Sequence, residues 1–175
     1  MRNSDKLIQK VRQELGDNRY VYWQKIWYQK IMEIFPGLMD KVPYEVYREI
    51  DEANTKGLKY CELPYDIFLS VSEKIELNGQ LKKQIGELFS KSKGNLDYEL
   101  WGPERSIHFD YKGNTFRIYL LNAGIKNEPT TLSVETSLTP KQVAKNIRAQ
   151  GFECRYQPWK RLLGYGETQA YKIKW

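Results

Sequence analysis

Hydrophobic positions in the first third of the chain recur with the period of an α-helix. A first helix is expected from Ser4, a suitable N-cap, to Gly16, a suitable C′ residue. A second helix is expected from Asn18 to about Phe35, because the helix-breaking pair Pro36-Gly37 follows. Apolar side chains cover more than one side of this second helix, which is typical of a helix packed in a core.

Three further helical segments are expected before residue 90. One begins at Pro43 and breaks at Asn54 and Gly57, and the next begins at Pro64 and ends at Asn78-Gly79. The inner face of the segment after Pro64 is expected to carry Ile67, Phe68, Val71 and Ile75. The last segment follows Asn78-Gly79 and places Leu81, Ile85 and Leu88 on one side.

The pattern then changes to the alternation of β-strands. Residues 106–121, SIHFDYKGNTFRIYLL, read as two strands joined by Gly113-Asn114 as a two-residue turn. This register pairs Tyr111 with Phe116 and gives the hairpin one apolar face. Its other face pairs His108 with Tyr119 and Asp110 with Arg117.

More strands flank the hairpin, and together they predict an α+β fold. Strands are expected at residues 96–101, 131–137, 152–157 and 169–175, with one helix from Pro140 to about Gly151. The predicted architecture is therefore a helical N-terminal region, residues 1–94, followed by an antiparallel sheet with one packed helix, residues 95–175. The polar segment Ser90 to Asn95 separates them, although the two regions are also compatible with one compact unit.

Composition places few further limits on the protein. The 175 residues are enough for a core, and 41% of them are hydrophobic, so the chain is not expected to be disordered. The polar start offers neither a signal peptide nor a membrane span, which favours the cytoplasm and argues against a membrane partner. Cys61 and Cys154 lack the spacing of a zinc site and are expected to be buried free thiols.

Charge is distributed unevenly along the chain. Residues 1–100 contain 16 Lys and Arg against 16 Asp and Glu, whereas residues 101–175 contain 12 against 6, so the whole net charge of +6 lies in the second part. Residues 141–175 alone contain eight basic and two acidic side chains. This asymmetry points to an anionic partner.

The leading hypothesis is a non-enzymatic module that binds DNA, RNA or a nucleic-acid-containing assembly. Lys141, Lys145 and Arg148 recur at i, i+4 and i+7, so they share one helical stripe that is suited to phosphate contacts. Cations and aromatic rings then interleave, as in surfaces that stack on unpaired bases. The predicted nucleic-acid-binding residues are Lys141, Lys145, Arg148, Arg155, Trp159, Lys160, Arg161 and Tyr165. An ordinary solvated basic face, with Trp159 in the core, explains the same pattern.

Two alternatives belong to other classes of function. Thirteen tyrosines and five tryptophans also suit a protein-interaction module, such as an inhibitor or adaptor that docks on a nucleic-acid-processing partner. The second alternative is a Mg²⁺-dependent nuclease, because Asp110 and Lys112 have acid-x-Lys spacing and Glu135 on the next strand is able to face them. The chain lacks nucleotide-binding, zincin and hydrolase motifs, so no cofactor is implied and catalysis is not favoured.

Overall fold

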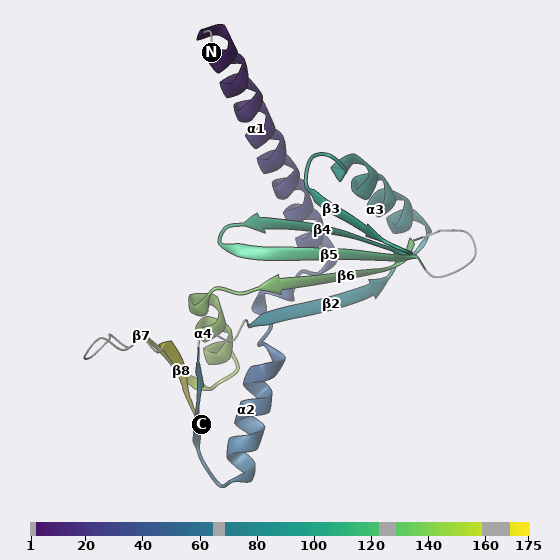
Figure 1. Ribbon diagram of the computed structural model, residues 1–175. Helices are drawn as coiled ribbons and strands as arrows, with labels where there is room; N and C mark the ends of the chain where they lie inside the picture. The colour runs from purple at the N-terminus through teal and green to yellow at the C-terminus, as the bar shows by residue number, and fades with distance from the viewer. Residues whose placement is uncertain (1–2, 65–68, 123–128, 159–168) are drawn as a thin grey trace. The chain divides into compact units, whose positions relative to one another are not determined.

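The computed structural model describes residues 3–64, 69–122, 129–158 and 169–175, which form helices and antiparallel sheets (Figure 1). The predicted α+β fold is therefore confirmed. The chain forms two compact units, and each unit is assembled from two separate stretches of sequence. Unit 1 comprises residues 1–36 and 73–135, and unit 2 comprises residues 37–72 and 136–175. None of the described helices combines the length and the apolar run that a membrane span requires.

Unit 1 is built on a five-stranded sheet in the order β2-β6-β5-β4-β3. Strands β2 and β6 continue from this unit into residues assigned to unit 2. The elements are α1 (Asn3–Ile34), β2 (Ser70–Glu76), α3 (Gly79–Ser92), β3 (Asp97–Trp101), β4 (Glu104–Tyr111), β5 (Asn114–Asn122) and β6 (Pro129–Ser137).

The hairpin of β4 and β5 has the predicted apolar face but a different register. Tyr111 pairs with Asn114 and Phe109 with Phe116, so the turn residues are Lys112 and Gly113 rather than Gly113 and Asn114. Both turn residues have positive φ, 50° and 82°, as a type I′ turn requires. The expected pairing was wrong because the turn lies one residue earlier than predicted. Each residue of β4 therefore pairs with a residue of β5 two positions earlier than expected. Such a shift leaves the same side chains on each face.

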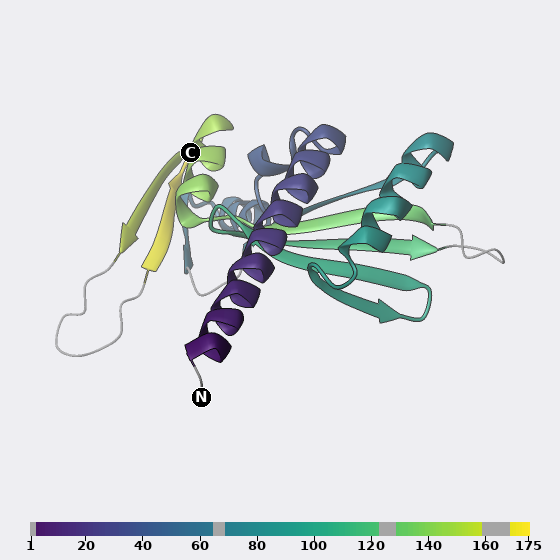
Figure 2. The ribbon, with the colours of Figure 1, turned by 90° about the horizontal axis from the view of Figure 1, so that it is seen from above.

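The N-terminal helix is continuous, so the expected break at Gly16 was wrong. Helix α1 spans 32 residues and includes Gly16 in its interior. A glycine inside a helix costs only about 0.5–1 kcal/mol relative to alanine, which neighbouring helical residues offset. Figures 1 and 2 show that the N-terminal turns of α1 extend beyond the sheet, whereas its C-terminal half crosses the strands.

The C-terminal half of α1 packs against both the sheet and α3. The Tyr28 ring contacts the rings of Tyr111 and Phe116, and Trp27 makes an edge-to-face contact with Phe89. The buried Trp27 Nε1–H donates to Ser92 Oγ over 2.6 Å. These contacts confirm that this part of the helix belongs to the core.

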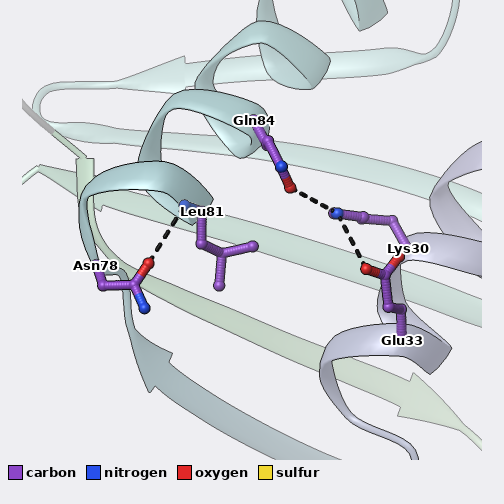
Figure 3. A network of polar contacts seen from close by, with 5 residues as sticks. All are labelled: Lys30, Glu33, Asn78, Leu81 and Gln84. Atoms are coloured by element: carbon purple, nitrogen blue, oxygen red, sulfur yellow. Dashed lines mark hydrogen bonds and ion pairs between the residues drawn. The ribbon is translucent and has the colours of Figure 1, made fainter.

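Polar contacts complete the junction of α1 with α3 (Figure 3). Lys30 Nζ donates to Gln84 Oε1 over 2.9 Å and forms an ion pair with Glu33 over 3.5 Å. At the start of α3, the Leu81 N–H donates to the side chain of Asn78, which acts as the N-cap. The predicted helical segment after Asn78 is thus confirmed, with its first turn fixed by that cap.

The expected helix after Pro64 was also wrong, because residues 70–76 form strand β2. Val71 and Ile75 are four positions apart, a spacing that places two side chains together on a helix and also on one face of a strand. Leu69, Val71 and Leu77 are buried, but Ile75, which was expected on the inner face, is 36% exposed, so that part of the prediction was wrong. Ile67 and Phe68 lie outside the described residues.

Unit 2 contains a three-stranded antiparallel sheet in the order β1-β8-β7. Its buried face includes Cys61 and Cys154, which both lie opposite Ile173 on the central strand. Helix α2 contacts β1, and α4 contacts β7. The elements are η1 (Leu38–Asp40), α2 (Tyr44–Thr55), β1 (Tyr60–Pro64), α4 (Pro140–Ala149), β7 (Glu153–Pro158) and β8 (Gln169–Lys174).

The expected boundary between residues 94 and 95 falls within unit 1. Helix α3 continues through Ser90 to Ser92, and Gly94 then turns the chain with a φ of 84°. Compactness alone does not measure which segments fold independently, so the division into residues 1–94 and 95–175 stays a prediction.

Candidate nucleic-acid interface

Helix α4 forms where the sequence supplies both of its ends. Thr139 caps the N-terminus, with its Oγ1 accepting the Gln142 N–H over 3.3 Å, and Pro140 occupies the first turn. Gly151 follows the helix with a φ of 93°, a conformation that favours glycine. Val143, Ala144 and Ile147 are buried along one side. The remaining sides of α4 are therefore available for polar residues.

The three predicted phosphate contacts lie together on the exposed side of α4. Lys141, Lys145 and Arg148 are all exposed, and the helix contains no acidic residue. Within the described part of the chain, none of the three forms an ion pair. A rise of 1.5 Å per residue gives the stripe a length of about 10 Å. We call these three residues the cation stripe.

Two amide side chains fix the position of α4 against the distant 3-10 turn η1. Asn146 is 3% exposed, and its Nδ2 donates to the carbonyl oxygens of Met39 and Lys41 over 2.8 and 2.9 Å. Gln142 Nε2 donates to Asn146 Oδ1 over 2.8 Å and to Met39 O over 3.3 Å. We call this arrangement the amide clamp. The sequence analysis missed it, although a Gln and an Asn four residues apart beside the apolar stripe were the available signal.

Arg155, the fourth predicted contact, is not part of the cation stripe. It is exposed on β7, whereas the neighbouring Cys154 is buried. Alternation along a strand places these two side chains on opposite faces of the sheet. Arg155 pairs instead with Lys172 of β8, and Lys172 forms an ion pair with Glu62 over 3.7 Å. Lys172 and Lys174 were counted in the basic excess but were not predicted as site residues.

The other four predicted contacts, Trp159, Lys160, Arg161 and Tyr165, lie outside the described residues. Their part in the interface stays a prediction from the sequence. The structure thus brings together Lys141, Lys145 and Arg148, and separates Arg155 from them.

The two thiols on the buried face of the three-stranded sheet are poor nucleophiles. Burial, with smaller contributions from the Glu49 carboxylate and from Cys154, raises the pKa of the Cys61 thiol from 9.0 to about 11. Burial also raises the pKa of Cys154, which the positive charge of Arg148 partly opposes. Both cysteines are free and buried, as predicted. Because the thiolate is the reactive form, neither thiol is suited to catalysis.

On the polar face of the β4–β5 hairpin, the two residues of the acid-x-Lys pair contact different neighbours. Asp110 lies opposite Thr115 rather than Arg117, and its Oδ1 accepts the Thr115 hydroxyl over 2.9 Å. Lys112 Nζ lies 5.4 Å from the ring centroid of Tyr111 and 5.7 Å from that of Tyr28, the α1 residue that packs on Tyr111. Among the described residues, no group of three His, Cys, Asp or Glu side chains, Glu135 included, is placed to hold a metal ion.

The only histidine of the chain lies in the middle of this polar face. His108 is directly opposite Arg117 on β5 and Asp97 on β3, not opposite Tyr119 as expected. Its ring makes an edge contact with Tyr119, with centroids 6.3 Å apart. Its Nε2 is buried without a hydrogen-bond partner among the described residues. The edge contact packs the His108 ring against Tyr119 of β5.

Comparisons with known protein families, curated proteins and solved structures found no match to this chain.

Proposed function

We propose that the chain is a non-enzymatic module that binds nucleic acid, or an assembly containing it, through the cation stripe of α4. The observation that carries the proposal is the alignment of three exposed cations, free of ion pairs within the described residues, on one short helix. Solvation alone does not require that exposed cations be aligned on one side of a helix. Exposed charges are usually interspersed with opposite charges, and α4 has none.

The dimensions of the cation stripe suit a phosphate backbone. The three cations follow one another at rises of about 6 and 4.5 Å along α4, and their long side chains are able to reach two or three neighbouring phosphates of one strand. The amide clamp holds α4 in place before binding, so little backbone entropy is lost when the contacts form. Lys and Arg in such a row read the backbone and not the bases, so we expect weak sequence preference.

The test is a comparison of two triple variants with equal changes of charge. Lys141→Gln, Lys145→Gln and Arg148→Gln together should lower affinity for duplex DNA and for RNA at least tenfold at low salt, measured by fluorescence anisotropy. The matched control replaces Lys74, Lys83 and Lys93 of unit 1, which are also exposed, with Gln. Equal losses in both variants would show nonspecific attraction to the net charge, and no binding by the wild type would defeat the proposal.

One surface favours the second candidate function, a protein-interaction inhibitor or adaptor. Tyr44, Tyr47 and Arg48 are exposed at i, i+3 and i+4 of α2, and Tyr and Arg are the residue types most often found at energetic centres of protein interfaces. A pull-down from host extract, with and without nuclease digestion, separates the two functions. Partners retained after digestion would favour the adaptor, and partners lost would favour nucleic acid. A cytoplasmic location stays a prediction in either case.

A further inference from the structure

The exposed face of the three-stranded sheet in unit 2 carries a second group of cations beside an exposed aromatic ring. In the register of the sheet, Tyr60, Lys174 and Glu153 form one cross-strand row, and Glu62, Lys172 and Arg155 form the next. The residues between them, Cys61, Ile173 and Cys154, are buried on the opposite face. The two rows therefore share the face that points away from the buried thiols.

Tyr60 is the aromatic residue of this face, and its side chain is 55% exposed. It lines a cavity of about 480 Å³ together with Lys59, Gly151, Glu153, Lys174 and Trp175. A second cavity of about 160 Å³ lies over Glu153, Arg155, Lys172 and Lys174. A concave surface thus continues from the Tyr60 ring along the cations of β7 and β8.

The Trp175 end of this surface is held in place. The Trp175 N–H donates to Lys59 O over 3.1 Å, and the Trp175 ring makes an edge contact with Phe152. The larger cavity is therefore bounded by residues that are fixed by backbone pairing or by packing. Such a preformed wall favours a planar ligand, because little conformational entropy is lost on binding.

We propose that this face binds a short stretch of unpaired nucleotides, with one base stacked on Tyr60 and the neighbouring phosphates contacted by Lys174 and Arg155. The inference goes beyond the proposed function, on which it rests, by assigning single-stranded nucleic acid to a second face of unit 2. A base inside a duplex has both faces covered by its neighbours, so only an unpaired base presents a face to the Tyr60 ring.

The two carboxylates of the face support a short single strand over a duplex. Glu62 neutralises Lys172 through their ion pair, and Glu153 lies beside Lys174 in register. A continuous row of phosphates laid across the sheet would meet both carboxylates. A flexible strand is able to place its phosphates at Arg155 and Lys174 and to turn its base toward Tyr60.

The first test compares variants of the ring. Tyr60→Ala should lower affinity for a labelled oligo(dT) by roughly 5- to 150-fold, the range expected for one lost stack, and should change affinity for a duplex less than twofold. Tyr60→Phe should retain the affinity of the wild type, because it keeps the ring. Tyr22→Ala, at a tyrosine that is 60% exposed on α1, is the matched control and should have no effect.

The salt dependence of binding distinguishes the contribution of the Tyr60 ring from that of the cations. Tyr60→Ala should leave the slope of log K against log salt for oligo(dT) unchanged, whereas Lys174→Gln should reduce its magnitude by about 0.7. A bromodeoxyuridine-substituted strand should also crosslink on irradiation to the peptide that contains Tyr60. This readout uses the unmodified protein and does not depend on the folding of a variant.

The outcomes distinguish this inference from the proposed function. If Tyr60→Ala binds oligo(dT) as well as the wild type does, or loses single-strand and duplex affinity equally, the inference is overturned and the cation stripe is unaffected. Crosslinks confined to peptides other than the one containing Tyr60 also overturn it. Failure of the wild type to bind any nucleic acid would instead remove the proposed function.

Discussion

The amide clamp offers a sharp test of how α4 is held in unit 2. Asn146 Nδ2 donates to two backbone carbonyl oxygens, those of Met39 and Lys41, and Asn146 Oδ1 accepts from Gln142. Asn146→Ala removes all three hydrogen bonds from a site that is 3% exposed. Met39 O keeps a contact with Gln142 Nε2, so Lys41 O is the acceptor left without its partner from α4.

The expected loss of stability follows from those contacts. One buried group that loses its partner costs about 1–3 kcal/mol, and the smaller side chain adds a cavity term. We therefore expect Asn146→Ala to lower the free energy of unfolding by about 2–4 kcal/mol. Gln142→Ala, at a half-buried position that leaves both Asn146 donors paired, should cost about 1 kcal/mol. The double variant should cost less than the sum, because the two residues share a hydrogen bond.

Asn146→Asp provides a pH-dependent check. The carboxylate oxygen that replaces Nδ2 would face the carbonyl oxygens of Met39 and Lys41 with no proton between them, so burial and these dipoles raise the pKa of the carboxyl group in the folded state. The folded protein then binds a proton more tightly than the unfolded chain does, and the variant should lose stability as the pH rises from about 4 to 7. Urea denaturation followed by circular dichroism measures each effect. A loss below about 0.5 kcal/mol for Asn146→Ala, or equal stability of Asn146→Asp at pH 4 and 7, would refute the clamp.

Three further variants test other parts of the fold. Gly16→Ala should stabilise the protein by about 0.5–1 kcal/mol in thermal unfolding, because Gly16 lies inside a helix with open space at its Cβ position; destabilisation would instead support a helix end there. Phe109→Ala, at a ring that is 2% exposed and stacked on Phe116, should lower the free energy of unfolding in urea by about 3–5 kcal/mol. Leu100→Ala, at a side chain that is 62% exposed, should lower it by less than about 0.5 kcal/mol, and similar losses for the two variants would contradict the assigned faces. The wild type should lose about 2 kcal/mol more than Cys61→Ala between pH 9 and 11, because the pKa of the thiol is raised in the folded state, which therefore favours the protonated form. Parallel pH profiles of stability would contradict the raised pKa.

The sequence predicted those features that local periodicity determines. The ends of α4, the N-cap of α3 and the two faces of the β4–β5 hairpin follow from residue types at fixed spacing. The register of the β4–β5 hairpin was not predicted from the residue types, because Lys112 in the turn adopts a φ of 50° that few side chains favour. The pattern also failed at residues 70–76, where an apolar pair four positions apart fits a strand and a helix equally well.

The candidate site was predictable only within one element. The cation stripe is a property of α4 alone, so its spacing was enough to identify it. The separation of Arg155 from the stripe depends on which face of β7 meets α4, and that is set by tertiary packing. Tyr60 joins Lys174 through a pairing across more than a hundred residues, which no local pattern contains.

The salt dependence of binding tests the central claim most directly, because it counts the phosphates that the cation stripe contacts. Each phosphate neutralised on duplex DNA contributes about 0.9 to the magnitude of the slope of log K against log salt. Replacement of Lys141, Lys145 and Arg148 with Gln should therefore reduce that magnitude by about 2–3, with folding preserved because exposed helical positions accept Gln at a cost of tenths of a kcal/mol. A slope equal to that of the wild type, in a variant that remains folded, would contradict phosphate binding by α4.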